Sequence, residues 1–314
     1  MTLDFKHSGR LGDIIYSMPL VKQMVAINGR SANYFVFNDV PARLGKDVFH
    51  PSPDVMVNVH LFNYIQPLLA TQSYISNISH ISAAQVPPGA LDLDRFKSGD
   101  LNLKAGLIYG WYRKAFGVSF ALEAPWLFVD GENATPLPDE YLGIAVLIGR
   151  TTRFCNTRIN YSFLDQIENV GFVGLDYEYA DFVNRHALSN VRHIKVNNAL
   201  ELANLMCRSK VFIGNQSSNF AIAEGLKIPR ALEAFEPVPV ASPVGGLCFE
   251  YINTQFLVDF LSRVLDVELK ASADIDGGAY CESIKAQAGY VVPIKQRLKN
   301  IFRRSNRINI DFFI

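Results

Sequence analysis

The chain has little of what marks metal-binding and disulfide-rich proteins. Its four cysteines stand far apart in 314 residues and form no C-x-x-C pair. Its six histidines lack the spacing of metal ligands. The sequence therefore predicts neither a zinc site nor a disulfide framework, and a reducing cytoplasm fits its cysteine usage best. The cysteines are Cys155, Cys207, Cys248 and Cys281.

Net charge and long apolar runs are also missing. The 30 basic and 30 acidic residues give a formal net charge of zero, so no global field attracts nucleic acid or membranes. No segment approaches the roughly 18–20 apolar residues of a bilayer span. The opening MTLDFKHSGR does not resemble a signal peptide. We expect a soluble, cytoplasmic protein.

What the chain does have is length and apolar content. Hydrophobic residues make up 49% of it, enough for sizeable cores, and 314 residues suit two α/β domains. The segment Asp130–Glu140, DGENATPLPDE, is rich in prolines and acids and is the predicted linker. We expect domains at 1–135 and 136–266, and a tail, 267–314, that packs back across them.

The most informative stretch is Asp4–Val21, which predicts a strand, a turn over Ser8–Gly12 and an apolar helix from near Asp13. Gly9 and Gly12 allow positive φ angles and close backbone approach. The helix points unpaired N–H groups at whatever lies above the turn, which favours an anion or a sugar. The Asp13 carboxylate can cap the helix or face a ligand. Acceptor or sugar contacts are predicted at Ser8, Gly9, Arg10 and Gly12.

Further elements are predicted in the first half from apolar runs and their end signals. They are a helix at Ile14–Ile27, a strand at Tyr34–Phe37, a helix at Leu101–Phe116 and a last strand at Trp126–Val129. Asp-x-Asp triplets occur at 92–94 and 274–276, and such triplets hold a cation against a diphosphate in many glycosyltransferases. Because they are common by chance, no metal is predicted.

The second half opens with a predicted strand at Leu142–Ile148, followed by the loop RTTRFCNTRIN. Clustered guanidiniums and hydroxyls at the carboxyl end of a strand suit phosphate recognition, and a solvated turn is the alternative. The candidate phosphate ligands are Arg150, Thr151, Arg153 and Arg158. Further βα units are predicted by strands at 171–175, 191–196 and 210–213, and a closing helix at Asn253–Leu265.

A second polar turn lies between the strand at 210–213 and an apolar helix at Asn219–Leu226. Its four polar residues at the helix N-terminus exceed what capping needs, although a capped helix without a ligand is the alternative. We predict a second anion or sugar site at Gly214, Asn215, Gln216, Ser217 and Ser218.

Both turns resemble signatures of the ADP-heptose:lipopolysaccharide heptosyltransferase family. Gly12, Asp13 and Pro19 fall on the Gly-Asp pair and the later proline of the first signature. Gly214 and Ser217 match the second signature, a Gly-x-Asp-Ser/Thr-Gly turn before a helix with a histidine.

Three residues depart from the second signature. Gln216 stands where the family has Asp, Ser218 where it has Gly, and Ala221 where it has His. An amide lacks the charge of a carboxylate, which puts ADP-heptose in question as the donor. Glu224 and Glu233 resemble the paired glutamates that contact the donor in many two-domain glycosyltransferases, with Glu224 as a donor ligand, although an exposed helical acid is the alternative.

The resemblance implies an α/β GT-B fold: two Rossmann-like domains whose parallel sheets face a central cleft. It implies an inverting, metal-independent glycosyltransferase without cofactors, with Asp13 as the general base and a nucleotide-diphospho-sugar as donor. The acceptor hydroxyl would belong to a glycan, a lipid-linked sugar or a modified nucleic acid.

Two other functions stay open. One is a DNA-modifying glycosyltransferase acting on a hydroxylated base, and the other is an inactive sugar-nucleotide-binding module, which Gln216 and Ala221 would permit. The amphipathic segment Ile294–Arg304 is predicted to pack on the protein, with contact to a membrane surface or to DNA as alternatives.

Overall fold

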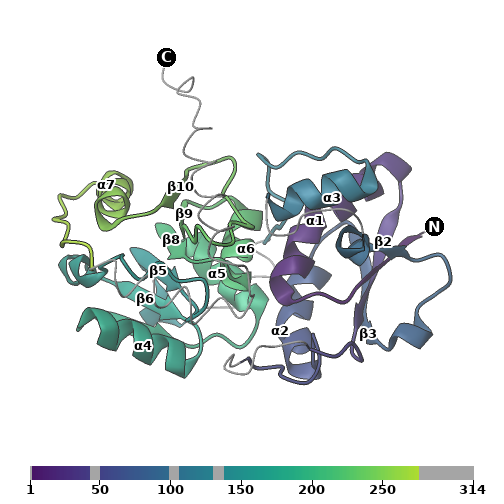
Figure 1. The fold of residues 1–314 in the computed structure, drawn as a ribbon, viewed down its shortest axis with the longest axis horizontal. Coiled ribbons are helices and arrows are strands. Elements are labelled where there is room, and N and C mark those ends of the chain that lie inside the picture. Colours follow the sequence, from purple (N-terminus) through teal and green to yellow (C-terminus); the bar gives the residue numbers. More distant parts are fainter. Residues whose placement is uncertain (1, 43–49, 99–105, 130–137, 276–314) are drawn as a thin grey trace, which may run out of the picture.

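A computed structural model describes residues 2–42, 50–98, 106–129 and 138–275 of the protein (Figure 1). The segment Ile294–Arg304 and most of the predicted linker Asp130–Glu140 lie outside these residues.

The first half of the chain builds a parallel sheet with strand order β3-β2-β1-β4. The strands are β1 (Thr2–His7), β2 (Ser31–Phe37), β3 (Ile75–Ile81) and β4 (Leu91–Asp92). The helices are α1 (Leu11–Asn28), α2 (Val59–Ala70) and α3 (Ile108–Phe116), and a short 3₁₀ helix, η2, spans Leu93–Lys97. The predicted strand at Tyr34–Phe37 is therefore confirmed as the end of β2.

The second half builds a parallel sheet with strand order β10-β9-β8-β5-β6-β7. Its strands are β5 (Val146–Gly149), β6 (Val170–Val173), β7 (Val191–Ile194), β8 (Val211–Gly214), β9 (Arg230–Glu233) and β10 (Cys248–Tyr251). Its helices are α4 (Asp176–His186), α5 (Ala199–Arg208), α6 (Ser218–Leu226) and α7 (Thr254–Leu265). Strands β5 and β8 are buried along their whole length, as expected where helices cover both faces of a parallel sheet. The predicted α/β class is confirmed.

Helix α1 joins the two halves. It begins two residues earlier than predicted, is buried from Ile14 to Val21, and ends at Gly29, whose φ of 59° suits a glycine. Figure 1 shows α1 beside α6, and α2 beside α5, between the two sheets. Side chains of α1 and of α6, such as Met18 and Phe220, belong to one continuous apolar core. The halves are therefore held together by packed apolar side chains, which resist their relative motion.

One predicted strand is wrong. Residues Trp126–Val129 form no strand; the backbone N–H groups of Trp126 and Leu127 both donate to the carbonyl of Gly225, at the end of α6. Both side chains are buried, so the apolar pattern reflects packing against the second half rather than a place in a sheet.

Strands β9 and β10 were not predicted, because their residues do not form an apolar run. Strand β9 carries Arg230 and Glu233, which are completely buried in ion pairs with Glu224 and Arg150. A charged pair formed only in the folded chain leaves no hydrophobic signature in the sequence.

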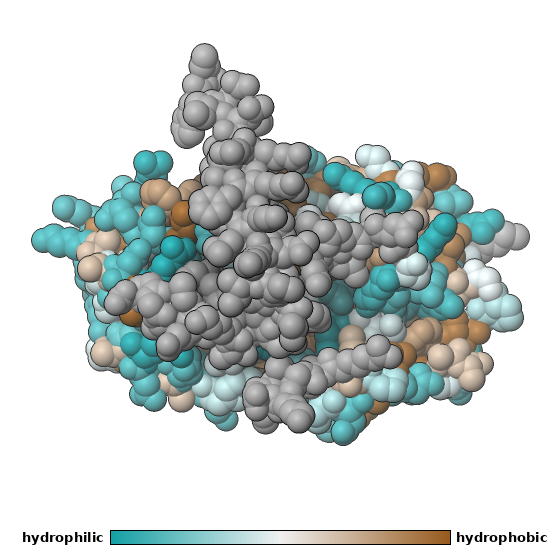
Figure 2. Space-filling view, viewed as in Figure 1, coloured by the Kyte–Doolittle hydropathy of each residue, from teal (hydrophilic) through white to brown (hydrophobic). Residues whose placement is uncertain are grey.

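None of the helices in the described part of the chain combines the length and the apolar composition that a bilayer span requires. Where Figure 2 is coloured, hydrophilic and hydrophobic residues are interspersed. The exposed large apolar side chains, which include Ile27, Val59 and Leu247, come from separate parts of the chain.

Candidate active site

The first turn, between β1 and α1, is anchored by an aspartate from η2. The backbone N–H and the hydroxyl of Ser8 both donate to Asp94 Oδ2, each at 2.6 Å, and Lys97 Nζ lies 2.5 Å from Asp94 Oδ1. Burial would raise the pKa of Asp94, but the Lys97 ammonium and the hydrogen bonds from Lys97 and Ser8 hold it well below its usual value. The first Asp-x-Asp triplet thus contributes an anchor for the turn: Asp92 caps η2 and Asp94 holds Ser8.

His7 also fixes this first turn. The N–H of Gly9 donates to His7 Nδ1 at 2.7 Å, so the ring proton lies on Nε2, which donates to the Tyr112 hydroxyl at 2.9 Å. Tyr112 donates in turn to the carbonyl of Asp13 at 3.2 Å. Burial lowers the pKa of His7 and keeps the ring neutral. This chain of hydrogen bonds sets the backbone of Asp13.

The carboxylate of Asp13 does not cap α1, so the capping interpretation is wrong. The N-cap is Arg10, which makes no side-chain capping bond, and Asp13 is the third helical residue. Its side chain is 33% exposed, and Oδ2 lies 3.9 Å from Lys97 Nζ. Gly9 has no positive φ; it is needed for space, because a Cβ there would lie 2.7 Å from Asp13 Oδ2. The expected positive φ at Gly12 is absent as well.

The second turn, between β8 and α6, is also well defined. Ser217 is the N-cap of α6 and accepts a bond from the N–H of Phe220 at 3.3 Å. Gln216 is nearly buried and accepts a bond from the N–H of Val240 at 3.3 Å. A Cβ on Gly214 would lie 2.5 Å from the carbonyl oxygen of Gly149, so close strand packing requires the glycine.

The loop after β5 is folded around the side chain of Asn215, which is completely buried. Asn215 Oδ1 accepts a bond from Thr151 N at 3.1 Å, and Nδ2 donates to the carbonyls of Thr151 and Arg153 at 2.9 and 2.6 Å. Phe154 has a φ of 54°, rare for a bulky residue, and its ring packs on Phe235. Asn215 therefore fixes the backbone that carries Arg153.

Two predicted donor ligands are instead buried in ion pairs. Arg150 is 4% exposed and donates from Nε to Glu233 Oε2 at 2.6 Å. Glu224 is completely buried, within 2.5 Å of both Lys227 Nζ and Arg230 Nε. Arg150 and Glu224 are therefore not the solvated surface charges that were the alternative to donor ligands. Both side chains support the structure around the turns.

The other members of the basic loop lie closer to the surface. Arg153 is half-buried, and so is Arg158, whose Nη2 lies 3.8 Å from Glu236 Oε2. The carboxylate of Glu233 also accepts the N–H of Asn156 and, at 2.7 Å, the hydroxyl of Tyr161. These partners were missed in the sequence, because they are scattered along it and none belongs to a motif.

The two turns meet at the junction of the halves. A Cβ on Gly12 would lie 3.9 Å from both the Cα and the nitrogen of Ser218, so the start of α1 faces the start of α6. Arg10 and Arg153 lie near enough that Arg153, after burial, helps to lower the pKa of Arg10. His50 was not among the predicted site residues. Its pKa is lowered to about 4, first by burial and then by the guanidiniums of Arg10 and Arg153. One catalytic candidate, two helix N-termini and two arginines thus converge.

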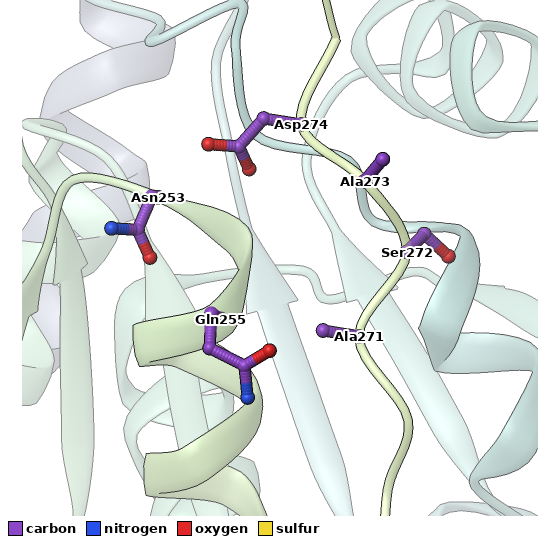
Figure 3. Close-up of a pocket in the computed structure, with 6 residues that line it drawn as sticks. All are labelled: Asn253, Gln255, Ala271, Ser272, Ala273 and Asp274. Atoms are coloured by element: carbon purple, nitrogen blue, oxygen red, sulfur yellow. The ribbon is translucent and has the colours of Figure 1, made fainter.

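A separate hollow of about 370 Å³ lies between the start of α7 and residues 271–274 (Figure 3). It is lined by Asn253, Gln255, Ala271, Ser272, Ala273 and Asp274. Asp274, from the second Asp-x-Asp triplet, accepts the N–H of Thr254, the first residue of α7, while Asn253 is the N-cap of this helix. Asp276 lies outside the described residues. Within the described ranges, no three His, Cys, Asp or Glu side chains gather as metal ligands would.

Comparison with known proteins gives similarity in fold. No family model and no curated protein sequence matches the chain. Among solved structures, E. coli ADP-heptose lps heptosyltransferase II is similar with a TM-score of 0.54 and 12% identity, over 84% of this chain and 98% of that chain. E. coli heptosyltransferase WaaC with ADP is similar with a TM-score of 0.51 and 10% identity, over 84% of this chain and 100% of that one. The resemblance seen in the two turns thus extends to the architecture, and the chain has the GT-B fold of the heptosyltransferases.

Proposed function

We propose that the protein is a glycosyltransferase that moves a sugar from a nucleotide-diphospho-sugar to a hydroxyl acceptor. The observation that supports this most is the meeting of the two turns, with Gly12 against Ser218. Sugar transfer needs a base for the acceptor and a cradle for the leaving diphosphate within reach of one anomeric carbon. The GT-B fold and the contact of Gly12, the neighbour of Asp13, with Ser218 support both roles.

In the proposed reaction, Asp13 takes the proton of the acceptor hydroxyl while its oxygen attacks the anomeric carbon of the donor. The base must be open to substrate yet fixed in place. Partial exposure of the carboxylate meets the first need. The hydrogen bond from Tyr112 to the Asp13 backbone and the Lys97 ammonium beside the carboxylate meet the second. The turn at Ser8–Gly12 would line the acceptor side.

The donor would lie on the second half. Its diphosphate leaves as the new bond forms, and the N-terminal N–H groups of α6 together with Arg153 would hold its charge in place of a metal ion. Attack from the face opposite the leaving group inverts the configuration of the anomeric carbon. Thr151, Gln216 and Ser217 would bind the donor's hydroxyls and phosphate oxygens, while Arg150 and Glu224 would support this surface from beneath.

The first test is a thermal-shift screen of nucleoside diphosphates and their sugars, since a ligand that binds only the folded protein raises the melting temperature. Release of the nucleoside diphosphate in the presence of candidate acceptors then measures transfer. Asp13→Asn should lower turnover by about two to four orders of magnitude with unchanged donor affinity and melting temperature.

The matched control is Asp259→Asn, which makes the same change at an exposed position on α7 and should leave turnover intact. Full turnover in Asp13→Asn would remove Asp13 from the role of base. Donor binding with neither hydrolysis nor transfer would support the inactive binding module instead.

A further inference from the structure

Each half of the molecule brings one arginine to the point where the halves meet. Arg10 directly precedes α1, two residues before Gly12, and Gly12 faces Ser218 at the start of α6. Arg153 is tied through its carbonyl to Asn215, three residues before Ser218. The segments that carry the two arginines are therefore fixed on opposite sides of the contact between Gly12 and Ser218.

Only one of the two terminal nitrogens of the Arg10 guanidinium has hydrogen-bond partners among the described residues. Its Nη1 donates to the carbonyls of Met56, Ser52 and Val55 at 2.7, 3.1 and 3.3 Å. Its Nη2 is buried, yet it has no hydrogen-bond partner among the described residues. Because a buried donor without a partner is unfavourable, this N–H₂ group is placed to gain from an acceptor that the described chain does not provide.

His50 is a neutral neighbour of Arg10. Its Nδ1 accepts the N–H of Ser52 at 2.9 Å and lies 3.2 Å from Arg10 Nη1, so it acts as an acceptor and the ring is neutral. Within residues 2–275, apart from the undescribed stretches, no carboxylate lies at ion-pair distance from Arg10 or Arg153. Asp13 acts on Arg10, and Glu178 acts on Arg153, only from beyond that distance. The ion pair of Asp13 is with Lys97.

We propose that Arg10 and Arg153 together bind one phosphoryl group between the two halves. Two neighbouring guanidiniums without a carboxylate in ion-pair contact repel, and an anion between them removes the repulsion. Their planar forks of N–H donors fit phosphate oxygens. The inference rests on the proposed function and deepens it: the first half, too, contacts a phosphoryl group, which belongs either to the donor's diphosphate or to a phosphorylated acceptor.

The test is calorimetric titration of the full chain with pyrophosphate at low ionic strength. Arg10→Gln and Arg153→Gln should each weaken binding by roughly tenfold to a hundredfold, the usual loss when a charged hydrogen bond disappears. The control Arg30→Gln removes the same charge at an exposed site near the far end of α1 and should bind as the wild type does. Wild-type affinity in either site variant would overturn the inference.

Arg10 also anchors residues 52–56, so its loss could disturb folding. Among the described residues the Arg153 side chain makes no hydrogen bond that Arg153→Gln would break, and Arg10→Lys keeps the charge without the fork of donors. The melting temperatures of the ligand-free variants are measured first. A loss of affinity confined to a variant that melts early, with Arg153→Gln binding normally, would show that Arg10 is only structural and would overturn the inference.

Two further arms identify the source of the phosphoryl group. If a nucleoside diphosphate displaces pyrophosphate and also binds both variants weakly, the site holds the donor. If inorganic phosphate still binds the protein saturated with nucleoside diphosphate, and needs Arg10 to do so, the site holds a phosphorylated acceptor.

The proposed function fails separately. Binding of pyrophosphate that needs both arginines, in a protein that binds no nucleotide-sugar, would overturn sugar transfer and leave this site standing. If the protein transfers sugar but its Arg10 and Arg153 variants bind pyrophosphate normally, the phosphoryl site is overturned and the proposed function stands.

Discussion

At the scale of single residues, the place of Asp13 depends on the missing side chain of Gly9. A Cβ at Gly9 would lie 2.4 Å from His7 Cε1 and 2.7 Å from Asp13 Oδ2. The His7 ring cannot yield easily, because hydrogen bonds to Gly9 and Tyr112 fix both of its nitrogens. Asp13 would therefore have to move away from the turn.

We predict that Gly9→Ala lowers the free energy of unfolding by about 1–3 kcal/mol, the usual cost of forcing extra atoms into a packed site. Gly110→Ala is the matched control, because Gly110 is exposed on α3 and a Cβ there would meet nothing within 4 Å. At that position alanine should stabilise the helix by about 0.5–1 kcal/mol. Denaturant unfolding of both variants measures the difference. A Gly9→Ala protein as stable as the wild type would contradict the argument.

Residue by residue, the sequence allowed some placements and not others. The position of Asp13 in the first turn of α1, and that of Ser217 at the start of α6, follow from local order along the chain: strand, glycine, polar turn, apolar helix. The burial of Arg150 and Glu224 could not be predicted, because it depends on partners in β9 that are neighbours only in the folded protein. His50 gave no signal at all, since no motif surrounds it.

At the scale of elements, Asn215 organises the loop that follows β5. Its amide replaces the backbone bonds that a regular turn would make, and it holds Thr151 and Arg153 while Phe154 takes a positive φ. A left-handed backbone costs a non-glycine residue about 1–2 kcal/mol. The Asn215 bonds and the packing of Phe154 on Phe235 offset that cost.

We predict that Asn215→Ala lowers the free energy of unfolding by about 2 kcal/mol, because it leaves partly buried backbone groups of the loop without partners. It should also weaken pyrophosphate binding, since Arg153 loses its fixed position. The control is Asn28→Ala, where the amide bonds the Met24 carbonyl at an exposed helix end. Unfolding in denaturant and titration with pyrophosphate give the two readouts, and unchanged values in both would show that the loop keeps its shape without Asn215.

At the scale of the whole molecule, the elements that follow from a regular hydrophobic pattern were predictable, whereas the contacts between the halves were not. The helix Ala199–Arg208 and the βα rhythm of the second half follow from alternating apolar runs and turns. The apolar stretch Trp126–Val129 looked like a strand because a buried crossing segment and a buried strand have the same composition. Only the contact of Trp126 and Leu127 with the end of α6 decides between them.

Neutral histidines in both halves affect the stability of the whole fold. Burial lowers the pKa of His7, and burial with neighbouring guanidiniums lowers that of His50 to about 4 and that of His186 to about 3. In the unfolded chain these rings take up protons near pH 6.5. Below that pH the unfolded state binds more protons than the folded state, so stability that is fully present above pH 6.5 is lost on acidification.

We therefore predict that the melting temperature falls between pH 7 and pH 5, and that His186→Phe reduces the fall. His186 lies against the rings of Tyr161 and Phe182, and its Nε2 has no partner among the described residues. Its Nδ1 accepts only a long hydrogen bond, 3.4 Å, from the N–H of Tyr161. Removing His186 should flatten the slope of unfolding free energy by up to about 1.4 kcal/mol per pH unit. The exposed His60→Gln is the control and should leave the slope as it is. An equal fall in wild type and His186→Phe would mean that this ring already carries its proton in the folded protein, against the burial that surrounds it.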